Sequence, residues 1–418
     1  MLGVTVRHLL FAQDENFWFE TLRSLGHITY GGAEFGEVEA TAERITPGDY
    51  DSWFDEWYAT AERIRADADA ARARGHMNTA RDSYLRASNY YRTAEFFLHG
   101  NPEDPRILQT YDKAIAAFGD FVELSGASVE RVAVPFEDTT LPGYFYPSPL
   151  PGRQPVVIMH NGFDGTAEEM HFFGAVAAQE RGFNVLTFDG PGQPGARQHQ
   201  GLLFRPDWEN VVGPVIDYVS DLPGVDTDQV SLLGISLGGE LCLRAAAFDP
   251  RIKAVMAVDG VYDFSELMMR FLDGDRAKVR AAVQAAEAPQ IDRQLTDAME
   301  SSPTARWAIT HGMYVMGGST PREFAARTMD FNVRDGIAER IGCPVLICEA
   351  EDDLFFKGQP EEVFDRLTAA SDKTLLRLTD AEGAGAHCHV GGQRYAFGKI
   401  LDWLGDRTPV VADAPVNA

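Results

Sequence analysis

GISLG, residues 234–238, is the stretch that decides the fold of this chain. It reads G-x-S-x-G, a pattern typical of a serine on a sharp turn between a strand and a helix. The apolar run 230–233 before it predicts a buried strand, and residues 239–247 after it favour a helix. A Cβ in place of either glycine would collide with the neighbouring strand or helix. The motif therefore predicts Ser236 as a nucleophile, and the alternative is a serine in an ordinary glycine-rich turn.

The composition is that of an ordinary soluble globular protein. Of the 418 residues, 45% are hydrophobic and 24% are charged, and this length predicts two to three structural units. The net charge of -26 disfavours binding to nucleic acid or to an anionic membrane surface. No apolar run is long enough to span a membrane, and the N-terminus does not have the pattern of a secretory signal.

The cysteines indicate a reducing compartment. They are Cys242, Cys343, Cys348 and Cys388. None forms a C-x-x-C pair, and three of them lie in or beside segments that we expect in the core. We therefore expect reduced, buried thiols in a cytoplasmic protein.

The sequence changes character near residue 125. Before it the patterns are helical, including an apolar stripe over residues 80–98 that follows a break at Gly75 and Asn78, which predicts a helical hairpin. After it, short strands alternate with helices, which predicts an α/β fold with a doubly wound, mostly parallel sheet. We expect a helical N-terminal domain over residues 1–125, an α/β domain over 126–408 and a flexible tail over 409–418.

The expected strands of this sheet are short apolar runs. They lie at residues 131–136, 141–146, 156–159, 183–188, 230–233, 254–258, 344–348 and 375–378, the first two forming a hairpin. The segment between the strands at 254–258 and 344–348 is far too long for a simple crossover. Because it carries helical patterns, such as those at 275–286 and 321–329, we expect a helical cap insertion at about 262–340.

A serine hydroxyl needs a base within hydrogen-bond reach, and the base needs a carboxylate to orient it. After a serine of this motif, the acid and then the histidine follow along the chain. His387 and His389 lie late enough, and the loop of small residues at 382–386 favours His387 as the base. The alternative is His389.

The acid is expected in the loop after the strand at 344–348. In the usual pattern it stands three residues after a small residue, and with Ala350 in that place the spacing selects Asp353. The alternative is Asp352. The remaining carboxylates of the loop are expected to be solvated charges, because a second negative charge beside the acid would raise its pKa if it were buried.

An oxyanion needs backbone N–H groups that already point at it. The residue after the nucleophile, Leu237, is expected to supply one. The loop at 160–165, HNGFDG, is expected to supply the other from Phe163. The competing interpretation is a plain turn with Phe163 packed in the core.

Other kinds of site have no matching pattern. The loop at 189–193, DGPGQ, lacks the lysine and serine or threonine of a phosphate-binding loop, and we expect it to shape one wall of a pocket. His387 and His389 are too close together to form a zinc pair on their own. We expect no metal.

Together these residues resemble the α/β-hydrolase superfamily, and more narrowly its branch with a helical N-terminal domain. That branch includes 2,6-dihydroxypseudooxynicotine hydrolase, fungal hydrolases that shorten polyketide chains in pigment pathways, and relatives of the fermentation-respiration switch protein. The resemblance is carried by the first 125 residues and by the segments 160–165, 189–193, 204–207, 234–239 and 382–388. The chain departs from the pattern D-G-P-G-Q-G by having Pro194 after Gln193.

The resemblance implies hydrolysis of a carbon–carbon bond beside a ketone, or of an ester, without a cofactor. It also implies a small-molecule substrate between the α/β domain and the helical domain, and it is compatible with a homodimer. A carboxylate after the strand at 254–258, either Asp259 or Glu266, is expected to orient the substrate. Further pocket candidates, by position alone, are His160, Tyr262, Trp307 and Tyr314.

Two routes fit these residues: an acyl-enzyme on Ser236, or a water activated directly by His387. A second class of function also fits the scaffold, since fold does not fix function. It comprises a tailoring enzyme that performs elimination or acyl transfer, and a ligand-binding protein. An intact serine, acid and histidine count against pure binding.

Overall fold

The computed structural model describes residues 9–410, and the chain divides into two compact units, Met1–Gly126 and Ala127–Ala418. Most of the tail expected at 409–418 lies outside the described residues. Within the described range, no helix is both long and apolar enough to cross a bilayer.

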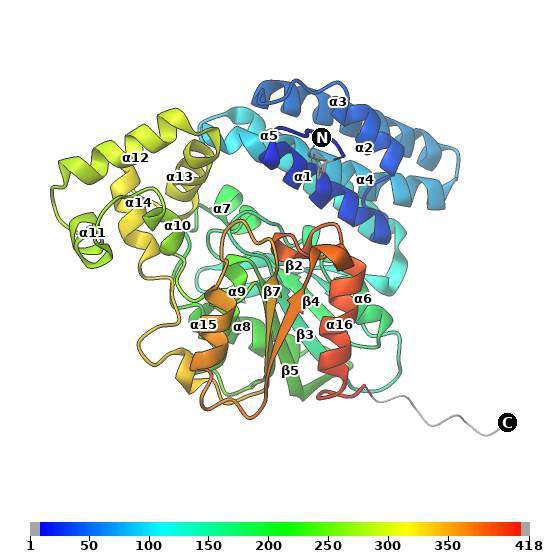
Figure 1. The fold of residues 1–418 in the computed structure, drawn as a ribbon. Coiled ribbons are helices and arrows are strands. Elements are labelled where there is room, and N and C mark those ends of the chain that lie inside the picture. Colours follow the sequence, from blue (N-terminus) through cyan, green and yellow to red (C-terminus); the bar gives the residue numbers. More distant parts are fainter. Residues whose placement is uncertain (1–8, 411–418) are drawn as a thin grey trace. The chain divides into compact units, whose positions relative to one another are not determined.

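The first unit is helical (Figure 1). Its elements are α1 (Glu15–Gly26), η1 (His27–Tyr30), α2 (Phe35–Ala42), α3 (Tyr50–Ala73), α4 (Met77–Glu95), η2 (Phe96–Gly100) and α5 (Pro105–Leu124). Helix α4 packs against both α3 and α5. The expected hairpin is the pair α3 and α4, and Gly75 takes a φ of 80° at the break between them. Trp53 is fully buried there and donates its indole N–H to the carbonyl of Thr93.

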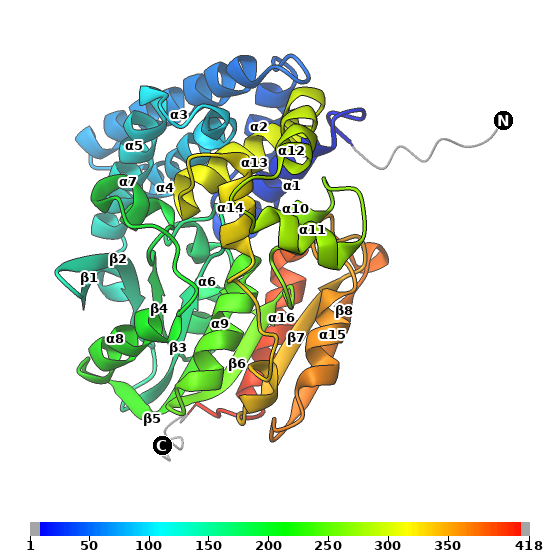
Figure 2. The ribbon, with the colours of Figure 1, turned by 90° about the vertical axis from the view of Figure 1, so that its left-hand side faces the viewer.

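The second unit contains one eight-stranded sheet in the order β1-β2-β4-β3-β5-β6-β7-β8. The strands are β1 (Glu130–Phe136), β2 (Thr139–Tyr146), β3 (Gln154–His160), β4 (Asn184–Phe188), β5 (Val225–Ile235), β6 (Ile252–Val258), β7 (Val345–Ala350) and β8 (Lys373–Leu378). The β1–β2 and β2–β4 pairs are antiparallel, and the other pairs are parallel. Figure 2 shows the sheet from β1 at one edge to β8 at the other. The expected α/β fold with a mostly parallel, doubly wound sheet is confirmed.

Helices cover both faces of this sheet. Apart from the insertion between β6 and β7, the helices from residue 126 onward are η3 (Gly126–Ser128), η4 (Glu169–His171), α6 (Ala175–Glu180), α7 (Pro194–Gln200), α8 (Glu209–Ser220), α9 (Leu237–Phe248), α15 (Gln359–Arg366), η6 (Asp380–Glu382), η7 (His387–His389) and α16 (Gln393–Gly405). Helices α8, α9 and α15 lie on one face, and α6 and α16 lie on the other (Figure 1). Buried strands with helices on both sides explain why the strands read as continuous apolar runs.

A helical insertion separates β6 from β7. It consists of α10 (Glu266–Met269), α11 (Arg276–Val283), α12 (Pro289–Ser301), α13 (Pro303–Met316), α14 (Pro321–Thr328) and η5 (Ala338–Arg340). Helix α13 is tied to the loops after β3 and β4, because Arg197 donates to the Tyr314 carbonyl and His311 bonds to the Phe163 carbonyl. The insertion therefore lies at the carboxyl ends of the strands, where parallel α/β sheets place their sites.

Candidate active site

Ser236 occupies a strained turn between β5 and α9. Its φ is 60° and its ψ is -126°, a conformation that non-glycine residues rarely adopt. The flanking glycines make the turn possible, since a Cβ on Gly234 would lie 1.9 Å from the carbonyl oxygen of Gly238. A Cβ on Gly238 would lie 2.7 Å from the carbonyl oxygen of Asn161. The strain falls on the serine itself, which distinguishes this turn from an ordinary glycine-rich one.

The structure brings His387 to Ser236. The Nε2 atom of His387 lies 3.0 Å from the Ser236 Oγ, and its Nδ1 lies 3.0 Å from the Asp353 Oδ2. The other oxygen of Asp353 accepts the backbone N–H groups of Phe355 and Phe356 at 2.6 and 2.9 Å. This serine, histidine and carboxylate follow β5, β8 and β7, so the strand ends position all three.

The two alternatives are placed differently. His389 is fully buried and its Nδ1 lies 2.8 Å from the Ala384 carbonyl, which identifies that nitrogen as the donor. Asp352 pairs through its backbone with the loop before His387, donating its N–H to the carbonyl of Gly385. In this geometry His387 and Asp353 are the pair that is hydrogen-bonded in line with Ser236.

A second carboxylate also lies against His387. The Asp259 Oδ2 is 3.1 Å from Nδ1 of the ring, and the Asp259 side chain is fully buried. Asp259 was expected to orient a substrate, but its position at the end of β6 directs it to the histidine instead. The sequence indicated a functional acid after this strand, but it did not indicate that His387 is the residue this acid contacts.

The charges around His387 determine its protonation. Burial lowers the pKa of the imidazole, but the carboxylates of Asp259 and Asp353 outweigh burial and raise it to about 9. For Asp353, burial would raise the pKa, while His387 and the two backbone N–H groups lower it to about 2. Burial raises the pKa of Asp259, which His387 opposes. The site thus holds an unusually basic imidazole between two acids.

The loop that carries Phe163, one expected oxyanion donor, lies against the start of α9, which carries the other, Leu237. A Cβ on Gly162 would lie 2.7 Å from the backbone nitrogen of Leu237, so the loop after β3 runs against the start of α9. Within residues 9–410, neither the Leu237 nor the Phe163 N–H donates to a protein acceptor. The Phe163 carbonyl lies 2.9 Å from the His311 Nε2, and its ring packs at 4.7 Å from the His311 ring. The two interpretations of Phe163 are therefore compatible: its ring packs against His311, while its own backbone N–H has no acceptor among residues 9–410.

His160 has a structural environment. It is fully buried, its Nε2 accepts the indole N–H of Trp208 at 3.3 Å, and its Nδ1 donates to the Asn161 carbonyl at 3.0 Å. Burial lowers its pKa to about 4, so the ring is neutral. Both of its nitrogens hold the loop after β3 in place, so neither is directed to a substrate.

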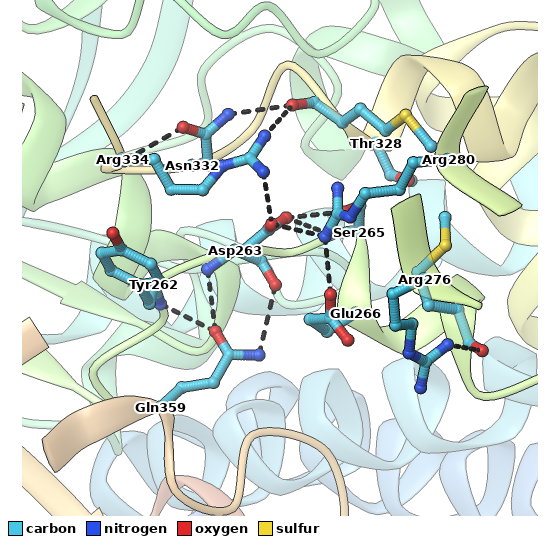
Figure 3. A network of polar contacts seen from close by, with 12 residues as sticks. Tyr262, Asp263, Ser265, Glu266, Arg276, Arg280, Thr328, Asn332, Arg334 and Gln359 are labelled. Atoms are coloured by element: carbon cyan, nitrogen blue, oxygen red, sulfur yellow. Dashed lines mark hydrogen bonds and ion pairs between the residues drawn. The ribbon is translucent and has the colours of Figure 1, made fainter. Parts of the chain in front are cut away.

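Tyr262 and Glu266 belong to a polar network at the base of the insertion (Figure 3). Gln359 accepts the backbone N–H groups of Tyr262 and Asp263 at 2.8 Å each. The buried Asp263 carboxylate binds Arg280 at 2.8 Å and Arg334 at 3.3 Å. Glu266 also binds Arg280, at 2.6 Å. The network ties together the two ends of the insertion and α15.

The aromatic candidates of the insertion lie on α13. Trp307 stacks on His311 with ring centroids 5.1 Å apart, and His311 in turn contacts Phe163. Tyr314 lies beneath the guanidinium of Arg197, 3.9 Å from its ring centroid. Trp307 is thus linked to the loop after β3 through one histidine. His311 was not among the expected residues, and its sequence context gave no signal, because a lone histidine in a helix is more often structural.

The loop at 189–193 supports the loop after β3, residues 160–165. Gln193 accepts the Gly190 N–H at 2.7 Å and donates to the Asn161 carbonyl, and Asp189 accepts the Gly195 N–H at 2.8 Å. Pro194, the departure noted in the sequence, is the first residue of α7, where a missing N–H costs nothing.

One group of metal-type ligands occurs among the described residues. Atoms of Asp259, His387 and Cys388 lie within 4.8 Å of one another. The same atoms already hold the imidazole, because Asp259 Oδ2 accepts the Cys388 N–H at 2.7 Å and lies on the His387 Nδ1. A metal here would compete with the contacts that orient His387.

The fold and this arrangement define a class, and comparison with known proteins agrees: the chain belongs to the α/β-hydrolase family. It matches the family described as "Alpha/beta hydrolase family" over residues 156–395, and the family described as "Esterase FrsA-like" over residues 4–269.

Among individual relatives, "Hydrolase LUC6" of Fusarium sp is 38% identical, covering 93% of this chain and 95% of the relative. The "20-hydroxy-prefusarin hydrolase FUS2" of Gibberella moniliformis is 37% identical, covering 95% and 97%. The solved structure of 2,6-dihydroxy-pseudo-oxynicotine hydrolase is 23% identical with a TM-score of 0.71, covering 93% of this chain and 98% of that one, and thus has the same fold.

Proposed function

We propose that this protein is a serine hydrolase in which Ser236 is the nucleophile, His387 the base and Asp353 the acid that orients the base. The observation that carries the proposal is the pair of 3.0 Å contacts from the two nitrogens of His387 to Ser236 and Asp353. Membership of the α/β-hydrolase family and relatives named as hydrolases support it.

In the reactive state His387 is neutral, with its Nδ1–H donating to Asp353 and its Nε2 accepting the Ser236 proton. As that proton moves, Oγ attacks a carbonyl carbon, and the N–H groups of Leu237 and Phe163 stabilise the oxyanion. When the intermediate collapses, the leaving group takes the proton from His387. Water, deprotonated by the same imidazole, then releases the acyl group from Ser236. In the second possible route, His387 activates water directly and Ser236 only polarises the carbonyl.

The proposed substrate is a small aromatic or secondary-metabolite molecule, and the bond cleaved is an ester or a carbon–carbon bond beside a ketone. A β-dicarbonyl suits the second case, because the enolate that leaves is stabilised by its neighbouring carbonyl. A relative named for hydrolysis of 20-hydroxy-prefusarin supports a substrate of this kind. No cofactor is needed for either reaction.

The test is a comparison of p-nitrophenyl esters with aryl β-diketones, using wild type, Ser236→Ala and Ser231→Ala. Ser231 is a buried serine on the same strand, β5, and controls for loss of a hydroxyl. We expect Ser236→Ala to lose a factor of about 10³ or more in kcat, and Ser231→Ala to keep most of the activity. Near-full turnover by Ser236→Ala would overturn the proposal.

Labelling with a fluorophosphonate separates hydrolysis from the other functions of the scaffold. We expect an adduct on Ser236 that is lost in Ser236→Ala. Turnover by the wild type without any adduct would favour direct water attack, elimination or acyl transfer.

A further inference from the structure

Asp259 is an unusual residue at the end of β6. It is fully buried, and its φ of 65° lies in the left-handed region that few residues other than glycine, asparagine and aspartate adopt. Its backbone carbonyl packs against the start of α9, since a Cβ on Gly239 would lie 2.4 Å from that oxygen. The backbone at Asp259 is therefore closely packed, and it sets where the carboxylate starts from.

The carboxylate of Asp259 lies against the imidazole of His387. Nδ1 lies 3.1 Å from the Asp259 Oδ2 and 3.0 Å from the Asp353 Oδ2. The two carboxylates come from the ends of different strands, β6 and β7. A nitrogen with a single proton can form one linear hydrogen bond, and Asp353 receives it. Asp259 is then an ion-pair partner beside the N–H axis, ready to accept the same proton after a small rotation of the ring.

The two carboxylates are stabilised differently. Asp353 accepts two backbone N–H groups on the oxygen that faces away from the ring. Asp259 accepts only the Cys388 N–H, on the oxygen that faces the ring, and its other oxygen has no partner among the described residues. A buried carboxylate with so few donors depends on a nearby positive charge, and His387 is the group placed to carry one.

We propose that Asp259 is a second positioning carboxylate for His387, which together with Asp353 fixes the ring towards Ser236 and stabilises its protonated form. This rests on the proposed function, because it assumes that His387 takes the Ser236 proton. Each turnover creates an imidazolium in a buried site, and two carboxylates neutralise it better than one. Asp259 touches His387 rather than the substrate.

The consequence is a shift in the pH dependence. The groups that face His387 are Asp259, Asp353, Asp164 and His389, and all three carboxylates raise its pKa, whereas burial lowers it. His387 must be neutral to act as a base, so kcat/KM should rise with pH through a pKa of about 9. Removing the charge of Asp259 should move this rise to lower pH.

The decisive experiment measures kcat/KM against pH for wild type, Asp259→Asn and Glu240→Gln. Asparagine keeps the shape and tolerates the positive φ, and Glu240→Gln makes the same acid-to-amide change at another fully buried carboxyl group, on α9. We expect the acid limb to move down by about one pH unit in Asp259→Asn and to stay in place in Glu240→Gln. An acid limb that does not move in Asp259→Asn overturns the inference.

A second measurement does not need Asp259→Asn to fold. In Asp353→Asn, Asp259 is the remaining acid, so the acid limb should stay above the ordinary histidine value of about 6.5. The kcat of Asp353→Asn should also be at least about ten times that of Ser236→Ala. A limb at the ordinary value with activity no higher than Ser236→Ala overturns the inference. If Ser236→Ala is itself fully active, the proposed function fails instead.

Discussion

At the scale of the residue, Glu240 is the one acidic residue of α9, and its environment is unfavourable for a charge. It lies one turn after Ser236, is fully buried, and neither of its oxygens has a hydrogen-bond partner in the described part of the chain. Burial raises its pKa from 4.5 to about 8, against the opposing effect of Arg244. In the folded protein at pH 7 the group is therefore neutral.

Glu240 should make the free energy of unfolding fall as pH rises. Between pH 4.5 and 8 the folded state holds a proton that the unfolded state has released. The contribution of Glu240 to stability is thus fully present below the unfolded pKa of 4.5. It is lost as the pH rises towards the folded pKa of about 8, at about 1.4 kcal/mol per pH unit. We expect Glu240→Gln to remove this slope. The free energy of unfolding of the variant in urea should therefore gain on that of the wild type between pH 5.5 and pH 7.5, by about 1.4 kcal/mol per pH unit. Glu287→Gln, at an exposed position, is the control, and an equal change there would contradict the explanation.

The residues at the strand ends could be chosen from the sequence because motif and chain order limit them. Ser236 came from its glycines, and His387 and Asp353 from the loops that follow the last strands. The partner of Asp259 could not be predicted, because the direction of its side chain depends on a positive φ that one sequence does not disclose. The proposed pocket role of His160 was misleading for a similar reason, since its two hydrogen bonds arise from tertiary packing with Trp208 and the next residue.

At the scale of the element, α13 connects the insertion to the loop after β3, which carries Phe163. His311 is buried on α13, and its Nε2 lies 2.9 Å from the Phe163 carbonyl. A carbonyl can only accept, so that nitrogen donates. Trp307 stacks on the other side of the imidazole and restricts its rotation. The helix therefore positions the residue whose N–H is proposed to stabilise the oxyanion.

We expect His311→Leu to lower kcat by about tenfold, less than the 10²–10³ typical of deleting an oxyanion donor, because the N–H remains but is held less firmly. His311→Gln, which can still donate, should recover part of the loss. Thr310→Ala changes the preceding residue of α13, whose hydroxyl donates to the Arg306 carbonyl of the same helix, and should behave as wild type. Steady-state kinetics would decide, and a leucine variant with unchanged kcat would mean that α13 does not position Phe163.

Elements were predicted unevenly. Most strands appear close to their expected limits, but β5 begins at Val225 rather than residue 230, because its first part is polar and lacks a strand pattern. Of the insertion, α11 and α14 coincide with helical patterns at 275–286 and 321–329. The sequence also carries a start signal for α13, because Ser302 accepts the Ala305 N–H as a cap and Pro303 follows it.

At the scale of the whole molecule, the alternation of strands and helices predicted a parallel sheet but not the order of its strands. Alternation reports that crossovers exist, whereas the order depends on which strands pack side by side. The geometry of the candidate site requires that order, because Ser236, Asp259, Asp353 and His387 follow β5, β6, β7 and β8, four neighbours in the sheet. Site residues spread over some 150 positions meet for this reason, as the sequence separation of 151 between Ser236 and His387 illustrates.

The net charge of the molecule gives a final prediction. The chain has 63 acidic and 37 basic residues, so many acidic residues have no basic residue with which to form an ion pair. Ion pairs such as Arg72 with Glu123 are partly exposed and each contribute at most about 1 kcal/mol. Repulsion among the excess acids acts over a longer range and is screened by salt.

We therefore expect repulsion to dominate, and the Tm to rise by about 2–4 °C between about 20 and about 200 mM NaCl. Choline chloride should have the same effect if the cause is screening rather than cation binding. The rise should shrink near pH 5.5, closer to the pI of about 4.7, because protonated histidines reduce the net negative charge. A Tm that falls with salt would mean that the attractive ion pairs contribute more to stability than the excess of negative charge removes.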